Sequence, residues 1–250
     1  EDRRLGFRFW KGFECTHNYN DSSYFNGGPG EPNKWGDYDA RAQTREACRY
    51  IENHDGEKPW VLMLSWGPPH DPYQAAPDEY KALYDPQALT LRDNVPPECD
   101  EQARKDLAGY YAHCTALDDC LAELLACLDR TGRAKDTVVV YTSDHGDMHC
   151  SQGHIRKQKP WEESIRVPLL VRDPRQPDQA GRTLDTPIDA PDLMPTLLEL
   201  CGLDVPETCQ GVSFASAVRG GPVPEYPGAL LAAYRPFHDW NLSRGGTPYR

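Results

Sequence analysis

Thr137-Val-Val-Val-Tyr-Thr-Ser-Asp-His-Gly-Asp147 is the stretch of the chain that says most about its fold. The β-branched and aromatic residues of its first half predict a strand, because such side chains pack well on a pleated, half-buried surface. Its second half, from Ser143 onward, is polar and contains a glycine, which predicts a loop at the end of that strand. A strand that leads directly into a loop with charged side chains is typical of a sheet that carries a site at its edge.

Helices and strands alternate on both sides of this stretch. Upstream, residues 102–129 predict a long helix that ends at Thr131-Gly-Arg133, because apolar residues recur there at every third or fourth position. Downstream, residues 165–171 predict a second strand, and Pro168 places it at a sheet edge or at a strand end. The apolar stripe of the long helix consists of Leu107, Tyr110, Cys114, Leu117, Leu121, Leu124 and Leu128.

A third strand is predicted nearer the N-terminus. Residues 60–66, Trp-Val-Leu-Met-Leu-Ser-Trp, form a continuous apolar run, which is typical of a strand covered on both faces. Gly67-Pro-Pro-His-Asp-Pro72 must then be a loop, because its three prolines are incompatible with a helix or a sheet ladder. Further helices are predicted over 37–54 with Asp37 or Asp39 as N-cap, over 77–84, and over 191–201 with Gly202 after its end.

This alternation predicts an α/β fold with a mainly parallel or mixed central sheet and helices on both of its faces. In such sheets, ligands bind beyond the carboxyl ends of the strands. The loops that contain His70 and Asp144 both follow predicted strands, so we expect them to reach one rim of the sheet. Residues 1–36 are rich in aromatic residues, Gly and Asn, and they predict irregular structure ahead of this core.

The charge of the chain limits what it can bind. Its 250 residues include 27 basic and 39 acidic side chains, which gives a net charge of −12. A surface of that sign repels polyanions, so general nucleic-acid binding is not expected. A small anionic substrate would instead depend on a local cationic site. No apolar run approaches the roughly 20 residues of a membrane helix, so no membrane segment is expected.

Nine cysteines are scattered along the chain without the close pairs of a structural zinc site. Cys114, Cys120 and Cys127 fall in the long predicted helix, where small buried thiols are the simplest interpretation. That interpretation fits a reducing compartment, and one or two disulfides are the alternative.

Asp144 and His145 are the first candidates for chemistry. An Asp and a His that are adjacent at a strand end can both turn toward one cation, and their oxygen and nitrogen donors suit several divalent metals. Gly146 permits a sharp backbone turn beside them. By itself, however, the triplet fits a capped turn better than a metal site.

A longer pattern resembles the sulfatase family of the alkaline phosphatase superfamily. In that family a strand ending in Ser-Asp-(Asn or His)-Gly is followed by a Lys, three residues, an aromatic residue, a Glu, and then Arg-(Val or Glu)-Pro. The residues that stand at this spacing after Ser143 are Lys157, Trp161, Glu162, Arg166 and Pro168. Four further segments resemble the family, so that the likeness spans nearly the whole chain: 12–17, 64–72, 110–147 and 192–196.

The resemblance implies roles for four residues. Asp144 would bind a divalent cation, which is usually calcium in sulfatases. His145 stands where many sulfatases carry Asn, so it would ligate a different ion, lie beside the metal, or contact the substrate. Lys157 would place a positive charge on the sulfate oxygens. His70 would contact the bridging oxygen and help the leaving group depart, since an imidazole titrates near neutrality.

The nucleophile of the family has no counterpart in these residues. Sulfatases attack with a formylglycine made from Cys or Ser in a C/S-x-P/A-x-R segment, and no such segment occurs here. We therefore expect it upstream, with the paired aspartates that complete the metal site. Two protein ligands fall short of the roughly 6–8 oxygens that calcium takes, so the chain alone should bind metal weakly. Without the nucleophile, its hydrolytic rate should be negligible.

The resemblance also implies the organisation of the chain. Residues 1–250 would be part of one catalytic domain with a truncated alkaline phosphatase-like fold, and both ends look like cuts through a longer protein. Residues 1–36 would lead into the domain, 37–203 would form its α/β core, and 204–250 would begin the C-terminal region. Sulfatases are commonly exported or lysosomal, which favours export weakly, and nothing in the sequence indicates an oligomeric state.

Three functions remain open at this point. The first is a sulfuric ester hydrolase that acts on a small or carbohydrate sulfate ester. The second is a phosphodiester or phosphonate monoester hydrolase of the same superfamily, because such sites often use His beside the metal-binding Asp and their four-oxygen anion has a similar shape. The third is a non-catalytic remnant, which the missing nucleophile motivates.

Overall fold

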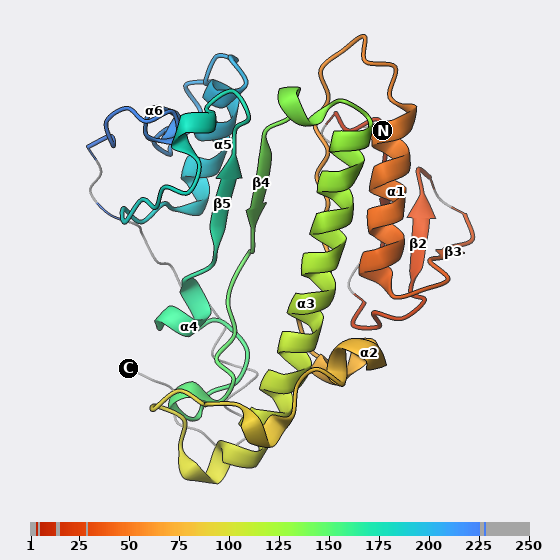
Figure 1. Cartoon of the computed structure of the whole chain (residues 1–250), viewed down its shortest axis with the longest axis vertical. Helices are drawn as coiled ribbons and strands as arrows, with labels where there is room; N and C mark the ends of the chain where they lie inside the picture. The colour runs from red at the N-terminus through yellow and green to blue at the C-terminus, as the bar shows by residue number, and fades with distance from the viewer. Residues whose placement is uncertain (1–3, 5, 14–15, 29, 226–227, 229–250) are drawn as a thin grey trace. The chain divides into compact units, whose positions relative to one another are not determined.

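The computed structural model describes residues 4, 6–13, 16–28, 30–225 and 228. They form two compact units, one built from residues 1–134 and 149–154 and the other from 135–148 and 155–250. The helices and strands of the first unit (Figure 1) are β1 (Lys11–Gly12), β2 (Ser23–Asn26), β3 (Asn33–Lys34), α1 (Asp39–Asn53), α2 (Asp78–Lys81) and α3 (Asp100–Arg130). Those of the second are β4 (Val139–Thr142), α4 (Glu162–Ile165), β5 (Leu169–Arg172), α5 (Ala190–Leu200) and α6 (Ala215–Val218). No helix among the described residues is long and apolar enough to cross a membrane.

Short 3-10 turns connect these elements, and they lie at Tyr73–Ala75, Pro86–Ala88, Pro97–Cys99, Ala134–Asp136, Ser151–Gly153 and Pro177–Gln179. The helix predicted over 77–84 is confined to the single turn α2, with Pro77 as its N-cap. The chain leaves α2 through a turn in which Leu83 N–H donates to the Tyr80 carbonyl (3.1 Å). The predicted helix was therefore too long.

A small antiparallel sheet with the order β1-β2-β3 lies in the segment that the sequence predicts to be irregular. Lys11 pairs with Asn26 in its first ladder. The ring of Tyr24 stacks on that of Trp35, with 4.0 Å between their centroids. Neighbouring aromatic side chains stabilise small sheets of this kind. The prediction of irregular structure over 1–36 was wrong for these strands, because it gave too little weight to their aromatic residues.

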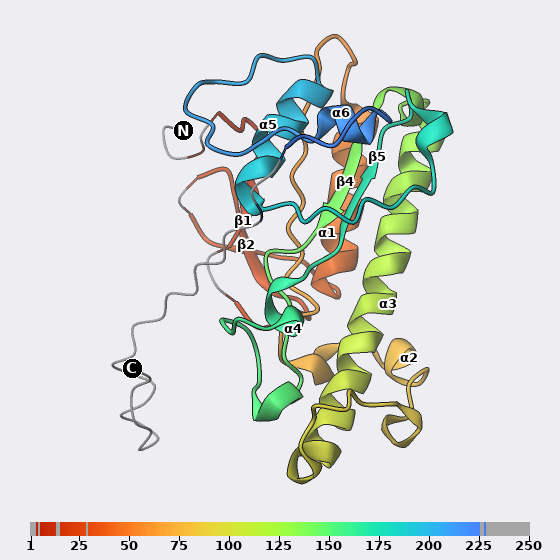
Figure 2. The same ribbon diagram turned by 90° about the vertical axis from the view of Figure 1, so that its left-hand side faces the viewer.

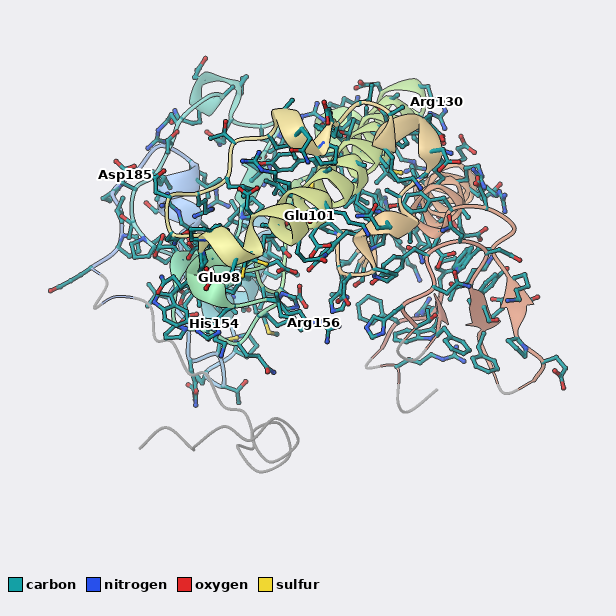
Figure 3. All side chains as sticks on the ribbon, turned by 90° about the horizontal axis from the view of Figure 1, so that it is seen from below. Glu98, Glu101, Arg130, His154, Arg156 and Asp185 are labelled. Carbon is teal, nitrogen blue, oxygen red and sulfur yellow. The ribbon has the colours of Figure 1, made fainter. Side chains whose placement is uncertain are left out.

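The long helix α3 confirms the helix predicted over 102–129, and it packs side by side with α1 (Figure 1). Figure 3 labels Glu101 and Arg130 near its two ends. Its buried face is not the predicted leucine stripe, because small residues line much of it and allow close packing between helices. These small residues are Ala103, Ala108, Gly109, Ala112, Ala116, Cys120 and Cys127. Of the predicted stripe, Leu117 and Leu128 are buried, and Leu107, Tyr110, Cys114, Leu121 and Leu124 are half-buried.

Gly109 shows how closely α3 approaches the chain beside it. A Cβ atom at this position would lie 2.6 Å from the backbone oxygen of Tyr73, which is well inside van der Waals contact. Glycine destabilises a helix interior by about 1 kcal/mol relative to alanine, so this contact explains its presence in mid-helix. The contact fixes the segment after His70 against α3.

Helix α1 begins where the sequence predicts, but its N-cap is Tyr38, so the prediction of Asp37 or Asp39 was wrong. Asp37 accepts a hydrogen bond from the Tyr38 N–H (2.7 Å) and pairs with Arg45 (2.7 Å). Asp39 is buried and accepts hydrogen bonds from the backbone N–H and the hydroxyl of Ser22. Both carboxylates are therefore used in tertiary contacts, which the sequence pattern does not reveal.

The segment predicted as a strand over 60–66 is extended, but it forms no ladder with any strand among the described residues. The prediction of a strand covered on both faces was therefore wrong in this structure. Exposure alternates along the segment: Val61 and Met63 are 74% and 77% exposed, and the residues between them are half-buried. Trp66 packs against the hydrophobic core of the first unit. This is the pattern of a strand with one covered face.

The sheet of the second unit consists of β4 and β5, which are antiparallel, with Val139 opposite Arg172. An antiparallel pair is compatible with the predicted mixed sheet and needs no crossover helix, because the connection at 143–168 is a long loop that contains only the 3-10 turn Ser151–Gly153 and the single turn α4. A parallel central sheet has no strand pair among the described residues, and it stays a prediction. β5 starts directly after Pro168, which confirms a strand end there, while Ile165 belongs to α4.

Helix α5 confirms the helix predicted over 191–201, and it ends as predicted. Gly202 has a φ of +72°. The N–H of Leu203 donates to the carbonyl of Leu198 (2.9 Å). This geometry is a Schellman C-cap, for which a glycine in the left-handed conformation is the preferred residue.

The first turns of α5 hold the chain that leads to α6, and the two helices lie side by side (Figure 2). The buried Asp192 carboxylate accepts hydrogen bonds from the backbone N–H groups of Asp189 (2.8 Å) and Val212 (2.7 Å). Thr196 Oγ1 accepts a hydrogen bond from the N–H of Phe214 (2.9 Å), whose side chain is fully buried. The segment 192–196, which resembles the sulfatase family, therefore has a structural role here.

The cysteines of the long helix are free thiols with little exposure, as the sequence predicts, and the other cysteines in the described part of the chain are free as well. Cys120 and Cys127 are buried and Cys114 is half-buried. Burial raises the pKa of the Cys114 thiol to about 11, which keeps it protonated and unreactive at neutral pH.

His113 is a fully buried polar residue in α3. Its Nε2 lies 3.4 Å from the Pro72 carbonyl oxygen, which can only accept, and its Nδ1 lies 2.7 Å from the Tyr38 hydroxyl. The neutral ring therefore donates from Nε2 and accepts at Nδ1. Burial lowers the pKa of His113 from 6.5 to about 4, because the charged form would lose its hydration.

This burial predicts a loss of stability in acid. Below about pH 6.5 the unfolded chain binds a proton at His113 that the folded chain does not bind until about pH 4, so the free energy of unfolding falls as pH decreases through this window. The loss from this residue should be about 3 kcal/mol. Urea unfolding at several pH values should show a flatter dependence for His113→Asn than for the wild type. The same slope in both proteins would contradict this, and the exposed His17→Asn is the control.

Candidate functional site

The loop after β4 places Asp144 and His145 beside one another. Asp144 Oδ2 and His145 Nε2 are 3.4 Å apart, and Asp144 Oδ1 accepts a hydrogen bond from the His145 backbone N–H (3.0 Å). Ser143 Oγ donates to the His145 carbonyl (3.0 Å), which closes the turn. The Asp144 side chain is 84% exposed and that of His145 is 30% exposed. The carboxylate can therefore reach a ligand in solution.

The hydrogen bonds of His145 set its tautomer. Its Nδ1 lies 2.8 Å from the Gly146 carbonyl oxygen, and a carbonyl only accepts, so Nδ1 carries the proton. Nε2 then has its lone pair beside the Asp144 carboxylate, and the two atoms can bind one divalent cation. These two donors would form only part of a metal site. In the part of the chain described here, no group of three or more His, Cys, Asp or Glu side chains is arranged to hold an ion.

Gly146 holds this loop against α4. A Cβ atom at position 146 would overlap the backbone carbonyl oxygen of Glu163. The Gly146 N–H donates to the Ser164 carbonyl (2.8 Å). Gly146 does not have a positive φ, so glycine is needed here for a close approach and not for the sharp turn that the sequence suggests.

Lys157 lies on a kinked segment. Its neighbours Arg156 (labelled in Figure 3) and Gln158 have φ values of +64° and +68°, a left-handed conformation that costs a non-glycine residue about 1 kcal/mol or more. Contacts offset this cost: the Arg156 N–H donates to Asp147 Oδ1 (3.1 Å), and the Arg156 carbonyl accepts from the Met148 N–H (2.8 Å). The backbone on either side of the lysine is thus held in one shape.

Ser164 joins the two loops. Its carbonyl accepts the hydrogen bond from Gly146, and its Oγ accepts a hydrogen bond from the Lys159 backbone N–H (3.2 Å). Ser164 is 3% exposed, so both bonds are shielded from water and are costly to break. The loop of Asp144 and the segment of Lys157 therefore share one buried anchor in α4.

His70 lies in the first unit, in the loop that follows the extended segment 60–66. Its Nδ1 is 2.8 Å from the Asp71 carbonyl oxygen and 3.0 Å from Asp71 Oδ1. Both of these atoms accept, so Nδ1 carries a proton, and proton transfer to a substrate would use Nε2. His70 belongs to a different unit from the other three candidates, and its convergence with them stays a prediction.

The contact between His17 and His70 was not predicted from the sequence. The ring of His17 stacks on that of His70, with 4.8 Å between the centroids and 16° between the planes. From the same segment, the Tyr19 hydroxyl donates to the Asp71 carbonyl (3.2 Å). The two histidines are far apart in the sequence, so no local spacing could have paired them. Ser164 was missed as well, because a serine inside a short helix has no distinguishing pattern.

Comparison with known proteins places these residues in context. The sequence profile of the family described as Sulfatase matches residues 2–203. The chain is 37% identical over 228 residues to an ulvan-active sulfatase of Formosa agariphila and 31% identical over 230 residues to an endo-4-O-sulfatase of Bacteroides thetaiotaomicron. These matches cover 90% and 86% of the chain but 44% of each relative, so the chain spans less than half the length of the relatives.

Solved structures agree on the α/β fold class. A sulfatase candidate from Bacteroides fragilis matches with a TM-score of 0.83 at 29% identity, over 89% of this chain and 50% of that chain. A phosphonate monoester hydrolase from Agrobacterium radiobacter matches with a TM-score of 0.67 at 24% identity, over 82% of this chain and 47% of that chain. The second likeness concerns the fold alone.

The contact at Gly146 predicts a strong effect of a single methyl group. Gly146→Ala should lower the free energy of unfolding by about 2 kcal/mol or more, because the new Cβ must push the Asp144 loop away from α4. Urea unfolding and loss of amide-exchange protection at residue 146 would measure the effect. Gly30→Ala is the control, since no atom lies within 4 Å of its Cβ position. Equal stability of both variants would show that the loop does not depend on this contact.

Proposed function

Because the chain belongs to the sulfatase family, we propose that it supplies part of the active site of a sulfuric ester hydrolase. The proposed parts are a metal-ligand loop at Asp144 and His145, a sulfate-binding Lys157 and a leaving-group acid at His70. The observation that carries the proposal is the buried anchor at Ser164, which fixes two matching segments of the family pattern to each other.

Lys157 provides the local positive charge that an anionic substrate needs. The net charge of −12 opposes the approach of a sulfate ester, so binding depends on a nearby cation. Lys157 is half-buried, and its neighbours hold a fixed backbone shape. A charge held in place before the substrate binds stabilises the transition state without further ordering. Lys157 would thus stabilise negative charge on the sulfate oxygens during S–O cleavage.

His70 acts on the leaving oxygen. Asp71 accepts a hydrogen bond from the Nδ1–H of His70 and so holds the ring in one tautomer, while the stacked ring of His17 restricts its tilt. Nε2 can then carry a second proton to the departing alkoxide. This contribution is largest for a sugar alcohol, which is a poor leaving group.

Asp144 and His145 would hold part of the coordination sphere of a divalent cation, with further ligands from the rest of the parent polypeptide. A carboxylate suits calcium, which is the ion proposed, and an imidazole also suits softer ions. When bound, such a cation polarises the sulfate oxygens. The formylglycine nucleophile would also come from outside these residues, because none of them forms a C/S-x-P/A-x-R segment.

A sulfated carbohydrate is the proposed substrate class. Two relatives support it, since one is named an ulvan-active sulfatase and the other an endo-4-O-sulfatase. The phosphonate monoester hydrolase shares 24% identity, which bears on the fold alone, so no observation favours phosphonate chemistry over sulfate chemistry. Comparing turnover of an aryl sulfate and an aryl phosphodiester by the parent enzyme separates the two.

Lys157→Ala tests the sulfate-binding role. In the parent enzyme it should lower kcat/KM for an aryl sulfate roughly 10²–10³-fold, because one preorganised charge at the transition state is lost. Lys159→Ala is the matched control, since it removes a side-chain charge from the same segment, and it should change kcat/KM less than about threefold. Equal effects of the two variants would exclude a specific role for Lys157.

His70→Ala tests the leaving-group role. The loss in kcat should reach roughly 10²–10⁴-fold for a sugar sulfate, because its alcohol needs a proton to depart. It should be much smaller for 4-nitrophenyl sulfate, whose leaving group is stable as an anion. The slope of rate against leaving-group pKa, measured over a substrate series, should steepen in the variant. A uniform loss across the series would instead indicate a structural role.

A further inference from the structure

A cleft of about 190 Å³ lies in the first unit, bordered by β2, β3 and α1. The proposed mechanism uses none of its residues. The side chains that matter for binding are Tyr24, Lys34, Trp35, Arg45, Glu46 and Arg49. Three of them are cationic and one is anionic, although the net charge of the chain is −12. The lining of the cleft therefore carries a net positive charge, opposite in sign to that of the whole chain.

The two arginines are held in place and still have donors to offer. Arg45 Nη1 donates to Asp37 Oδ2 (2.7 Å), and Arg49 Nη1 donates to Glu46 Oε2 (2.8 Å). Each of these bonds uses one of the five N–H groups of a guanidinium. The Arg45 and Arg49 side chains are 42% and 63% exposed. Their planar forks can thus bind a tetrahedral oxyanion by two parallel hydrogen bonds.

The carboxylate in the cleft does not cancel this charge. Glu46 pairs with Lys11 (2.6 Å) as well as with Arg49, and its side chain is only 16% exposed. Lys34 Nζ donates to the backbone carbonyl of Asp21 (3.1 Å), which carries no charge. Within the described residues, no carboxylate forms an ion pair with Lys34. When the ion-paired neighbours Lys11 and Asp37 are counted with the lining, four cations face two carboxylates, so a net positive charge is left for an anion.

Aromatic rings form one wall of the cleft. Tyr24 and Trp35 stack with 4.0 Å between centroids, and the Lys11 ammonium lies 5.5 Å from the Tyr24 centroid. Trp35 is half-buried, and an aromatic ring at the edge of such a cleft can pack against the apolar face of a sugar.

We propose that this cleft binds one sulfate group of a sulfated oligosaccharide, with Arg45, Arg49 and Lys34 on the sulfate oxygens and Trp35 against the sugar ring. Pockets for whole small ligands measure roughly 300–1,000 Å³, so this cleft suits a single charged substituent of a longer chain. The assignment of the anion to a sulfated sugar rests on the proposed function. The cationic and aromatic lining is independent of it.

Calorimetric titration of the chain with a chondroitin 4-sulfate hexasaccharide, at concentrations where sedimentation shows a monomer, tests the site. Binding should be saturable and at least about tenfold tighter than for the unsulfated hexasaccharide or for inorganic sulfate. The double variant Arg45→Gln with Arg49→Gln should weaken it at least about tenfold, because two charge-assisted hydrogen-bond donors are lost. The control is Arg130→Gln. Arg130 (labelled in Figure 3) lies on α3 and pairs with Glu52 of α1 (2.7 Å), so its loss should change the affinity less than about twofold.

Equal affinity of the double variant and the wild type, or no binding at all, overturns the proposal. Inorganic sulfate that binds as tightly as the hexasaccharide overturns the assignment to a sugar. If the double variant fails to fold, Lys34→Gln makes the same test, since it alters an exposed residue. Binding is measured without turnover, so a parent enzyme that leaves sulfate esters intact would refute the proposed function and not this site.

Discussion

The candidate site depends on the two hydrogen bonds of one buried serine. Ser164 holds the loop of Asp144 through its carbonyl and the segment of Lys157 through its hydroxyl. The helix that presents it, α4, has a single turn, and a helix that short is not stable by itself in water. The loops and α4 therefore stabilise one another, and a substitution that displaces one loop should also displace the other. The loop proposed to bind the metal and the lysine proposed to bind sulfate therefore share one anchor.

The helices could be predicted well from the sequence, and their environments less well. The 3.6-residue period located α3 and α5 to within two residues, and Gly202 marked the end of α5, because period and C-cap chemistry are local properties. The same period did not identify the buried face of α3. Alanine and glycine permit the close contact at Gly109, whereas a hydrophobicity pattern gives more weight to leucine. Which face of α3 is buried depends on the segment that packs against it, and the sequence of α3 alone does not specify that segment.

Strand pairing and the hydrogen bonds that anchor the site were even harder to predict from the sequence. The apolar runs at 60–66 and 137–142 predicted extended structure, but an apolar run does not specify its partner or the direction of that partner. Asp144, His145 and Lys157 were proposed from a spaced motif and His70 from a separate loop that resembles the family, and the roles of all four stay predictions. The contacts of Ser164 and His17 could not be predicted, since they join backbone groups or rings from segments far apart in the sequence. The need for glycine at 146 was predicted, although for a different physical reason.

The extended segment at 60–66 has a practical consequence. Its backbone N–H and C=O groups have no ladder partner among the described residues, and Val61 and Met63 expose large apolar side chains. An exposed apolar edge of this kind is a template for pairing with the same segment of another molecule. These 250 residues produced in isolation should accordingly tend to aggregate as concentration rises, and a soluble preparation would need that edge covered by a fused partner strand or blunted by a lysine.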